Sequence, residues 1–127
     1  MSHFTSVKTQ FVDINFIIKA LQDLDLKFEV GQFKIRGFGG KQTEVDIKIK
    51  PAGLSYDVGL RKKGDTYEVV ADWMGVHGLD QRKFIQSLNQ RYAYHATCAK
   101  LEEQGFTLAT ETKEKDGNIH LILRRIA

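Results

Sequence analysis

The dipeptide Asp116-Gly117 stands between two runs of alternating apolar and polar residues, "FTLATETK" and "IHLILRRI". Asp-Gly suits the two central positions of a tight hairpin turn, which need a positive φ angle, and the alternation has the period of a β-strand. We therefore predict a β-hairpin here, with both turn residues in a left-handed conformation.

A second hairpin is predicted around "KKGD" in the middle of the chain. The simplest register places Leu60 opposite Tyr67 on a buried face and leaves Asp57 and Glu68 on a face open to water. Further upstream, "FKIR" and "TEVDIKIK" also alternate, and the segment "GFGGKQ" between them predicts a turn.

Two helices interrupt these strands. Asp13 is placed to cap a short amphipathic helix whose apolar residues recur at helical spacing up to Leu24. Asp80 is placed to cap a longer one, "DQRKFIQSLNQRYAYHATCAKLEEQG", which Gly105 is expected to end.

These elements predict an α+β fold in one domain covering residues 1–127, with a mainly antiparallel sheet and both helices on one face. A chain of this length buries about two thirds of its unfolded surface, enough for an ordinary core. The similar passages "KALQDLDLKFEV" and "AKLEEQGFTLAT" suggest a strand-helix-strand-strand pseudo-repeat, although common α+β patterning explains them equally well.

Composition excludes several classes of protein. Cys98 is the single cysteine, so an internal disulfide is impossible, and no apolar run has the length of a signal peptide or a membrane span. We expect a soluble protein of the cytoplasm or an organelle matrix. The net charge of +3 permits an acidic partner, but the basic residues are spread rather than gathered on one element.

The stretch "ADWMGVHG" has two interpretations. In the first, Asp72, Trp73 and His77 surround a cleft at the sheet edge, where a histidine exchanges protons near neutral pH. Alternatively, Trp73 continues the strand alternation into the core, and the glycines form the turn before Asp80. We favour the second interpretation and predict no catalytic residue.

Metal and phosphate sites are also not expected. His95 and Cys98 lie one helical turn apart, but a structural zinc site needs about four ligands and the chain has no second cysteine. The stretch "GFGGK" lacks the spacing of a phosphate-binding loop, so a plain turn is favoured. We predict neither a metal nor a cofactor.

Basic residues offer a possible nucleic-acid surface on the outward side of neighbouring strands. Glu44, Asp46, Asp57 and Glu68 dilute it, which favours a solvated face of mixed charge. The candidate basic patch comprises Lys34, Arg36, Lys48, Lys50, Arg61, Lys62 and Lys63.

Three segments, "MSHF", "YDVGLRKKGDTYEVVADW" and "LNQRYAYH", together resemble the family catalogued as domain of unknown function 1257. Its plastid members are called hypothetical chloroplast reading frame 35. The resemblance implies a cytoplasmic or stromal setting in cyanobacteria, in algal plastids or in cells infected by viruses of cyanobacteria. It implies no activity, so no catalytic residue is carried over.

We therefore predict a non-enzymatic module of photosynthetic cells that binds another protein. A nucleic-acid-binding module is the alternative, and an enzyme with an unrecognised site near Asp72 and His77 is the third possibility. For Arg91 we favour a structural role, in which its guanidinium pairs with a sheet carboxylate such as Asp72, over a role in binding. The predicted partner-binding residues are Arg91, Tyr94, His95, Met74 and His77.

Overall fold

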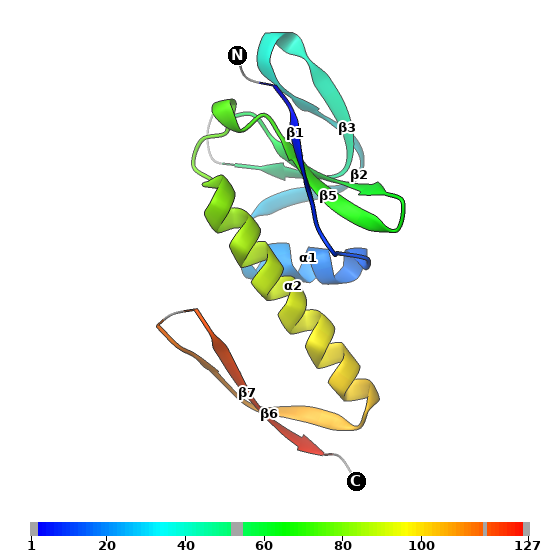
Figure 1. The fold of residues 1–127 in the computed structure, drawn as a ribbon, viewed down its shortest axis with the longest axis vertical. Helices are drawn as coiled ribbons and strands as arrows, with labels where there is room; N and C mark the ends of the chain where they lie inside the picture. The colour runs from blue at the N-terminus through cyan, green and yellow to red at the C-terminus, as the bar shows by residue number, and fades with distance from the viewer. Residues whose placement is uncertain (1–2, 52–54, 116, 126–127) are drawn as a thin grey trace. The chain divides into compact units, whose positions relative to one another are not determined.

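A computed structural model describes residues 3–51, 55–115 and 117–125 of the chain. It has the α+β architecture expected from the sequence (Figure 1). The chain divides into two compact units, Met1–Tyr92 and Ala93–Ala127, and the boundary falls within the long helix. The organisation of the chain as a single domain stays a prediction.

The first unit contains a five-stranded antiparallel sheet in the order β1-β5-β4-β3-β2. Two short 3₁₀ turns, η1 (Phe38–Gly40) and η2 (Trp73–Gly75), follow strands β2 and β5. The strands are β1 (Thr5–Lys8), β2 (Lys27–Arg36), β3 (Gln42–Lys50), β4 (Val58–Lys63) and β5 (Thr66–Ala71).

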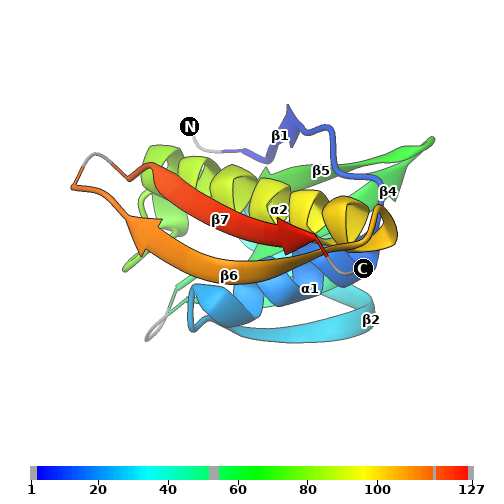
Figure 2. The ribbon, with the colours of Figure 1, turned by 90° about the horizontal axis from the view of Figure 1, so that it is seen from below.

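Helix α1 (Ile14–Asp23) and helix α2 (Gln81–Glu103) begin at the predicted caps. The Asp13 carboxylate accepts a hydrogen bond from the Asn15 amide at 2.8 Å, and Asp80 accepts one from the Lys83 amide at 2.9 Å. Each cap satisfies an amide that the first helical turn leaves without a partner. Within the first unit, both helices lie on the same side of the sheet (Figures 1 and 2).

Tyr92 joins α2 to the segment that leads into α1. Its hydroxyl accepts hydrogen bonds from the amides of Val12 and Asp13, both at 3.0 Å. Its ring stacks on Phe11 with centroids 4.3 Å apart and meets the edge of Phe16 at 5.8 Å. Both helices and the sheet also contribute fully buried side chains to the core: Ile17, Leu21, Ile47, Leu60, Val69 and Leu88.

The β4–β5 hairpin forms, but the predicted register is wrong by two residues. Leu60 lies opposite Val69, not Tyr67, and the connecting loop is Gly64-Asp65. Gly64 takes a positive φ of 65° at the first loop position, where a type II′ turn needs glycine. This requirement moves the turn one residue beyond the centre of "KKGD" and shifts every facing pair.

Glu68 was expected on a wet face, and that prediction is also wrong. Glu68 is only 3% exposed, because the second face of the sheet carries an apolar cluster of its own. That cluster contains Ile35, Val45 and Val70, with Phe4 packed against it. Alternation alone does not distinguish a strand with one buried face from a strand buried on both.

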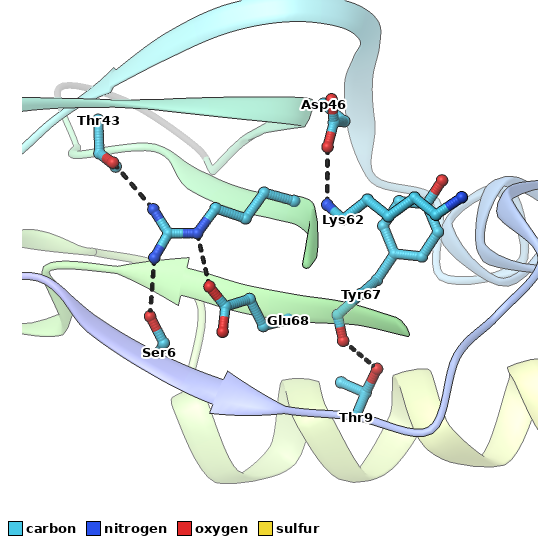
Figure 3. Close-up of polar contacts among 8 residues, drawn as sticks. Ser6, Thr9, Thr43, Asp46, Lys62, Tyr67 and Glu68 are labelled. Atoms are coloured by element: carbon cyan, nitrogen blue, oxygen red, sulfur yellow. Dashed lines mark hydrogen bonds and ion pairs between the residues drawn. The ribbon is translucent and has the colours of Figure 1, made fainter. Parts of the chain in front are cut away.

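Arg61 compensates the buried carboxylate of Glu68. Its Nε lies 2.6 Å from Glu68 Oε1, while Nη1 donates to Thr43 at 3.0 Å and Nη2 donates to Ser6 at 3.2 Å (Figure 3). We call these four residues the Arg61 clamp. It connects strands β1, β3, β4 and β5 through one guanidinium group.

The second unit contains the end of α2 and the antiparallel strands β6 (Phe106–Lys113) and β7 (Ile119–Arg125). The predicted hairpin is therefore confirmed. Gly117 has the expected positive φ, at 91°, whereas Asp116 lies outside the described residues. A helix followed by a hairpin thus occurs in both halves, but β2 and β3 join the large sheet while β6 and β7 form a separate one.

Replacing Arg61 by alanine should destabilise the protein by about 3–5 kcal/mol, because the substitution leaves a buried carboxylate unpaired. Denaturant unfolding measures the effect. Lys50→Ala is the matched control, since the Lys50 ammonium also lies 2.6 Å from a carboxylate, that of Glu29, but both side chains are exposed. Equal stability of the two variants would contradict the role of the clamp.

Candidate functional site

Two exposed apolar side chains lie on neighbouring loops at one end of the five-stranded sheet. Met74, in η2, is 80% exposed, and Phe38, in η1, is 53% exposed. The two loops lie toward the same end of the first unit (Figure 1). Large apolar side chains on adjacent loops are typical of interaction surfaces. We call this region the Phe38–Met74 surface.

Asp72 holds the two loops together. The residue is fully buried, and its Oδ2 accepts a hydrogen bond from the Phe38 amide at 2.9 Å. Its backbone carbonyl accepts a second bond from the Gly75 amide at 3.1 Å, within η2. A single residue at the end of β5 therefore fixes both the turn that carries Met74 and the turn that carries Phe38.

The Met74 loop is also fixed by the chain segment before β4. The Tyr56 amide donates to the Gly75 carbonyl at 2.9 Å, and the His77 amide donates to Ser55 Oγ at 2.8 Å. A Cβ atom on Gly75 would lie only 2.1 Å from the Tyr56 ring, so the close contact requires glycine. Met74 is thus exposed on a loop whose backbone is hydrogen-bonded on both sides.

A pocket of about 310 Å³ lies beside this surface, lined by His3, Asp72, Trp73, Met74 and Gln81 among others. The sequence predicts that Trp73 continues the strand. The structure differs, because β5 ends at Ala71 and Trp73 begins η2. Its ring is partly exposed and lies 6.3 Å from the Phe84 ring. Asp72 Oδ1 and Trp73 Nε1 are buried without a hydrogen-bond partner among the described residues.

The third possibility, an enzyme site near Asp72 and His77, gains no support from this pocket. His77 is exposed and does not line it. General acid-base catalysis requires the two groups to reach the same substrate atom or one another. The pocket brings Asp72 together with Trp73 and Met74, but leaves the histidine outside.

Arg91 serves the packing of the two helices. Its Nε lies 2.8 Å from Asp23 Oδ2 at the end of α1, so the suggested pairing with Asp72 is wrong although the suggested kind of contact is present. Ten residues separate Arg91 from the start of α2, about 15 Å along the helix axis. Arg91 and the Met74 loop therefore do not converge on one small site.

Tyr94, His95 and Cys98 belong to the second unit. The Tyr94 hydroxyl donates to Glu111 Oε2 at 2.9 Å, and its ring meets His95 edge-on at 5.0 Å. The pKa of Tyr94 is raised to about 12. Burial of the phenol is the largest cause, and the hydrogen bond to Glu111 is the next. Cys98 is a free thiol, and the described residues contain no group of three or more side chains able to hold a metal ion.

Three of the seven residues of the candidate basic patch pair with carboxylates. Lys48 lies 3.6 Å from Asp57, Lys50 pairs with Glu29 at 2.6 Å, and Arg61 is held inside the clamp. Lys34 is opposite Glu44 in the β2–β3 register. The patch residues lie on strands, as expected, and carboxylates lie among them.

Phe38 is the residue of this surface that the sequence analysis missed. "GFGGK" forms the expected turn, in which the Gly37 amide donates to the Lys41 carbonyl at 2.8 Å. The signal that could have indicated Phe38 is a large aromatic residue inside a glycine-rich turn. The turn itself requires no apolar side chain at that position.

The family described as "Protein of unknown function (DUF1257)" matches residues 20–122. The chain belongs to this family. "Uncharacterized protein ycf35" from Pyropia yezoensis is 35% identical over 98% of both chains, and the protein of the same name from Cyanophora paradoxa is 34% identical over 98% of both. These relatives are plastid-encoded. No solved structure matches the chain.

The relatives agree with the resemblance carried by the central hairpin and the long helix, and they assign no activity. Among the described residues, neither helix is long and apolar enough to cross a membrane.

The raised pKa of Tyr94 predicts a stability change at high pH. The neutral phenol is favoured in the folded state, so its contribution is complete below the ordinary pKa of 10.0 and is lost as the pH rises toward about 12. Tyr94→Phe should lose less stability than the wild type between pH 10 and pH 12, measured by denaturant unfolding at a series of pH values. Identical slopes for the two proteins would contradict this role.

Proposed function

We propose that this chain is a non-enzymatic protein-binding module and that the Phe38–Met74 surface is its docking site. The observation that carries the proposal is the exposure of two large apolar side chains on loops that a buried carboxylate holds together. Exposing apolar surface to water is unfavourable, so a fixed display of this kind favours a partner that covers it. Methionine suits such a surface because its flexible thioether adapts to a partner's shape.

The charges around the surface favour an acidic partner. Arg36 and Lys41 flank the turn that carries Phe38, and both are exposed. The turn between them contains no carboxylate, and the nearby Asp72 is buried and already bonded to the Phe38 amide. We therefore commit to an apolar segment of another protein with acidic residues beside it, since opposite charges guide the encounter and fix its orientation.

The setting and the remaining surface are consistent with this proposal. The relatives are plastid-encoded, which favours a partner from the plastid stroma or the cyanobacterial cytoplasm. The nucleic-acid alternative has less support, because Lys48, Lys50 and Arg61 are each paired with a carboxylate. Binding that depends on nucleic acid is therefore an outcome that would contradict the proposal.

Photo-crosslinking tests the docking site directly, because the chain has only two methionines, Met1 and Met74. Photo-methionine incorporated into the protein should crosslink a partner through residue 74 in an extract of photosynthetic cells. The crosslinked partner peptide should contain apolar and acidic residues. Nuclease treatment should leave the yield unchanged.

Variants of the same protein provide the matched comparison. Phe38→Ser should reduce crosslinking at residue 74 by at least about tenfold, the effect of losing roughly 1.4 kcal/mol of binding energy. Val12→Ser is the control, because Val12 is equally apolar and 62% exposed but lies outside the surface. Equal loss in both variants, or crosslinking that nuclease abolishes, would reject the proposed site.

The helix residues that the sequence predicts to bind a partner, Arg91 and Tyr94, are tested in the same experiment. Arg91→Ala with Tyr94→Ala should lower thermal stability, since their side chains bond Asp23 and Glu111. Crosslinking by the fraction that remains folded should be preserved. Lost crosslinking at unchanged stability would instead assign the partner surface to the helix.

A further inference from the structure

The edges of the two sheets differ in how they are protected from pairing with another chain. An edge strand presents unpaired amide and carbonyl groups, and proteins blunt such edges with short strands, bulges or charges. In the first unit, β1 is only four residues long. The opposite edge, β2, is interrupted by a register shift between Val30 and Phe33 and carries Lys27 and Lys34.

Strand β7 is protected less, because its two arginines, Arg124 and Arg125, stand at its C-terminal end. In the described part of the chain, β6 and β7 pair only with each other, so each has one open edge. The register shift of this hairpin lies between Leu108 and Thr110 of β6, whereas β7 runs through seven consecutive residues, "IHLILRR". This strand contains no proline or lysine, and Ile122 in its middle is 60% exposed.

We propose that β7 pairs antiparallel with β7 of a second copy of this chain, so that two hairpins form one four-stranded sheet across a two-fold axis. The pairing would supply partners for the open backbone groups of both strands. It would also bring the two Ile122 side chains close to the axis and remove them from water, in the self-complementary arrangement of a two-fold interface.

The charges of the hairpin favour a second copy in antiparallel orientation. Glu114 lies at the turn end, where its Oε1 is 2.9 Å from His120 Nε2 near the start of β7. Arg124 lies at the opposite end of the same strand and is exposed. Antiparallel pairing about Ile122 therefore places Arg124 of each copy opposite His120 of the other, whose ring contacts Glu114, whereas parallel pairing would align like charges.

The small size of the second unit also favours association with a second copy. A structural unit below about 40 residues usually needs a disulfide, a metal or association with another chain for stability. The single cysteine excludes an internal disulfide, and the unit offers a two-stranded sheet, which alone is marginally stable. Association through β7 would double the number of strands.

Sedimentation equilibrium of the full chain over a wide concentration range tests the proposal. The wild type should be a dimer, and Ile122→Lys should weaken the dimer at least about tenfold by placing two ammonium groups near the axis. Val30→Lys is the matched control, because Val30 is an exposed apolar residue, 48% exposed, on the protected edge strand β2. Circular dichroism should show that both variants remain folded.

A charge exchange tests the orientation separately. Arg124→Glu should weaken the dimer, and adding Glu114→Arg should restore it, since antiparallel pairing sets Arg124 opposite His120, whose ring contacts Glu114. A wild type that stays monomeric at all concentrations, an Ile122→Lys dimer of unchanged affinity, or a charge exchange that restores nothing would each overturn the proposal. These results leave the Phe38–Met74 surface untouched, because that surface lies in the first unit.

Discussion

The buried carboxylate of Glu68 is the constraint on which the first unit depends. The second face of the sheet packs Ile35, Val45 and Val70, so Glu68 is shielded from water and its charge must be compensated inside the protein. Arg61 provides that compensation and uses its remaining guanidinium N–H groups on Thr43 and Ser6. The clamp thereby connects strands β1 and β3 to the β4–β5 hairpin on the face of the sheet that carries the apolar cluster.

Asp72 repeats the same principle at the end of the sheet. It is a buried carboxylate whose hydrogen bond goes to a backbone amide, that of Phe38, in place of a guanidinium. The result is a pair of loops that are rigidly attached to the sheet and yet display apolar side chains to water. Binding through preorganised loops loses less conformational entropy than binding through flexible ones, and this is the physical reason why the Phe38–Met74 surface is suited to a partner.

Local chemistry made much of the fold predictable. Asp13 and Asp80 as caps, Gly105 after the long helix, and both hairpins follow from preferences that act within a few residues. The β4–β5 register, the burial of Glu68 and the position of Trp73 were not predictable in this way. The register depends on the turn that Gly64 requires, and the position of Trp73 on the end of β5 at Ala71. The burial of Glu68 depends on a second apolar face that the alternation of "TYEVVA" does not reveal, since nearly all of β5 is buried. Of the proposed surface, the sequence indicated Met74 through its glycine-rich loop but did not indicate Phe38, because only a distant carboxylate connects the two loops.

Amide hydrogen exchange at Phe38 tests most directly whether a buried carboxylate assembles the surface. The amide lies in an exposed turn, and its hydrogen bond to Asp72 Oδ2 at 2.9 Å is the contact that protects it. Measured by NMR on the wild-type protein, the Phe38 amide should exchange as slowly as amides of the neighbouring strands, and much more slowly than that of the adjacent Gly39. Exchange of the Phe38 amide at the rate of an unstructured peptide would show that the two loops are not joined, and would contradict the account.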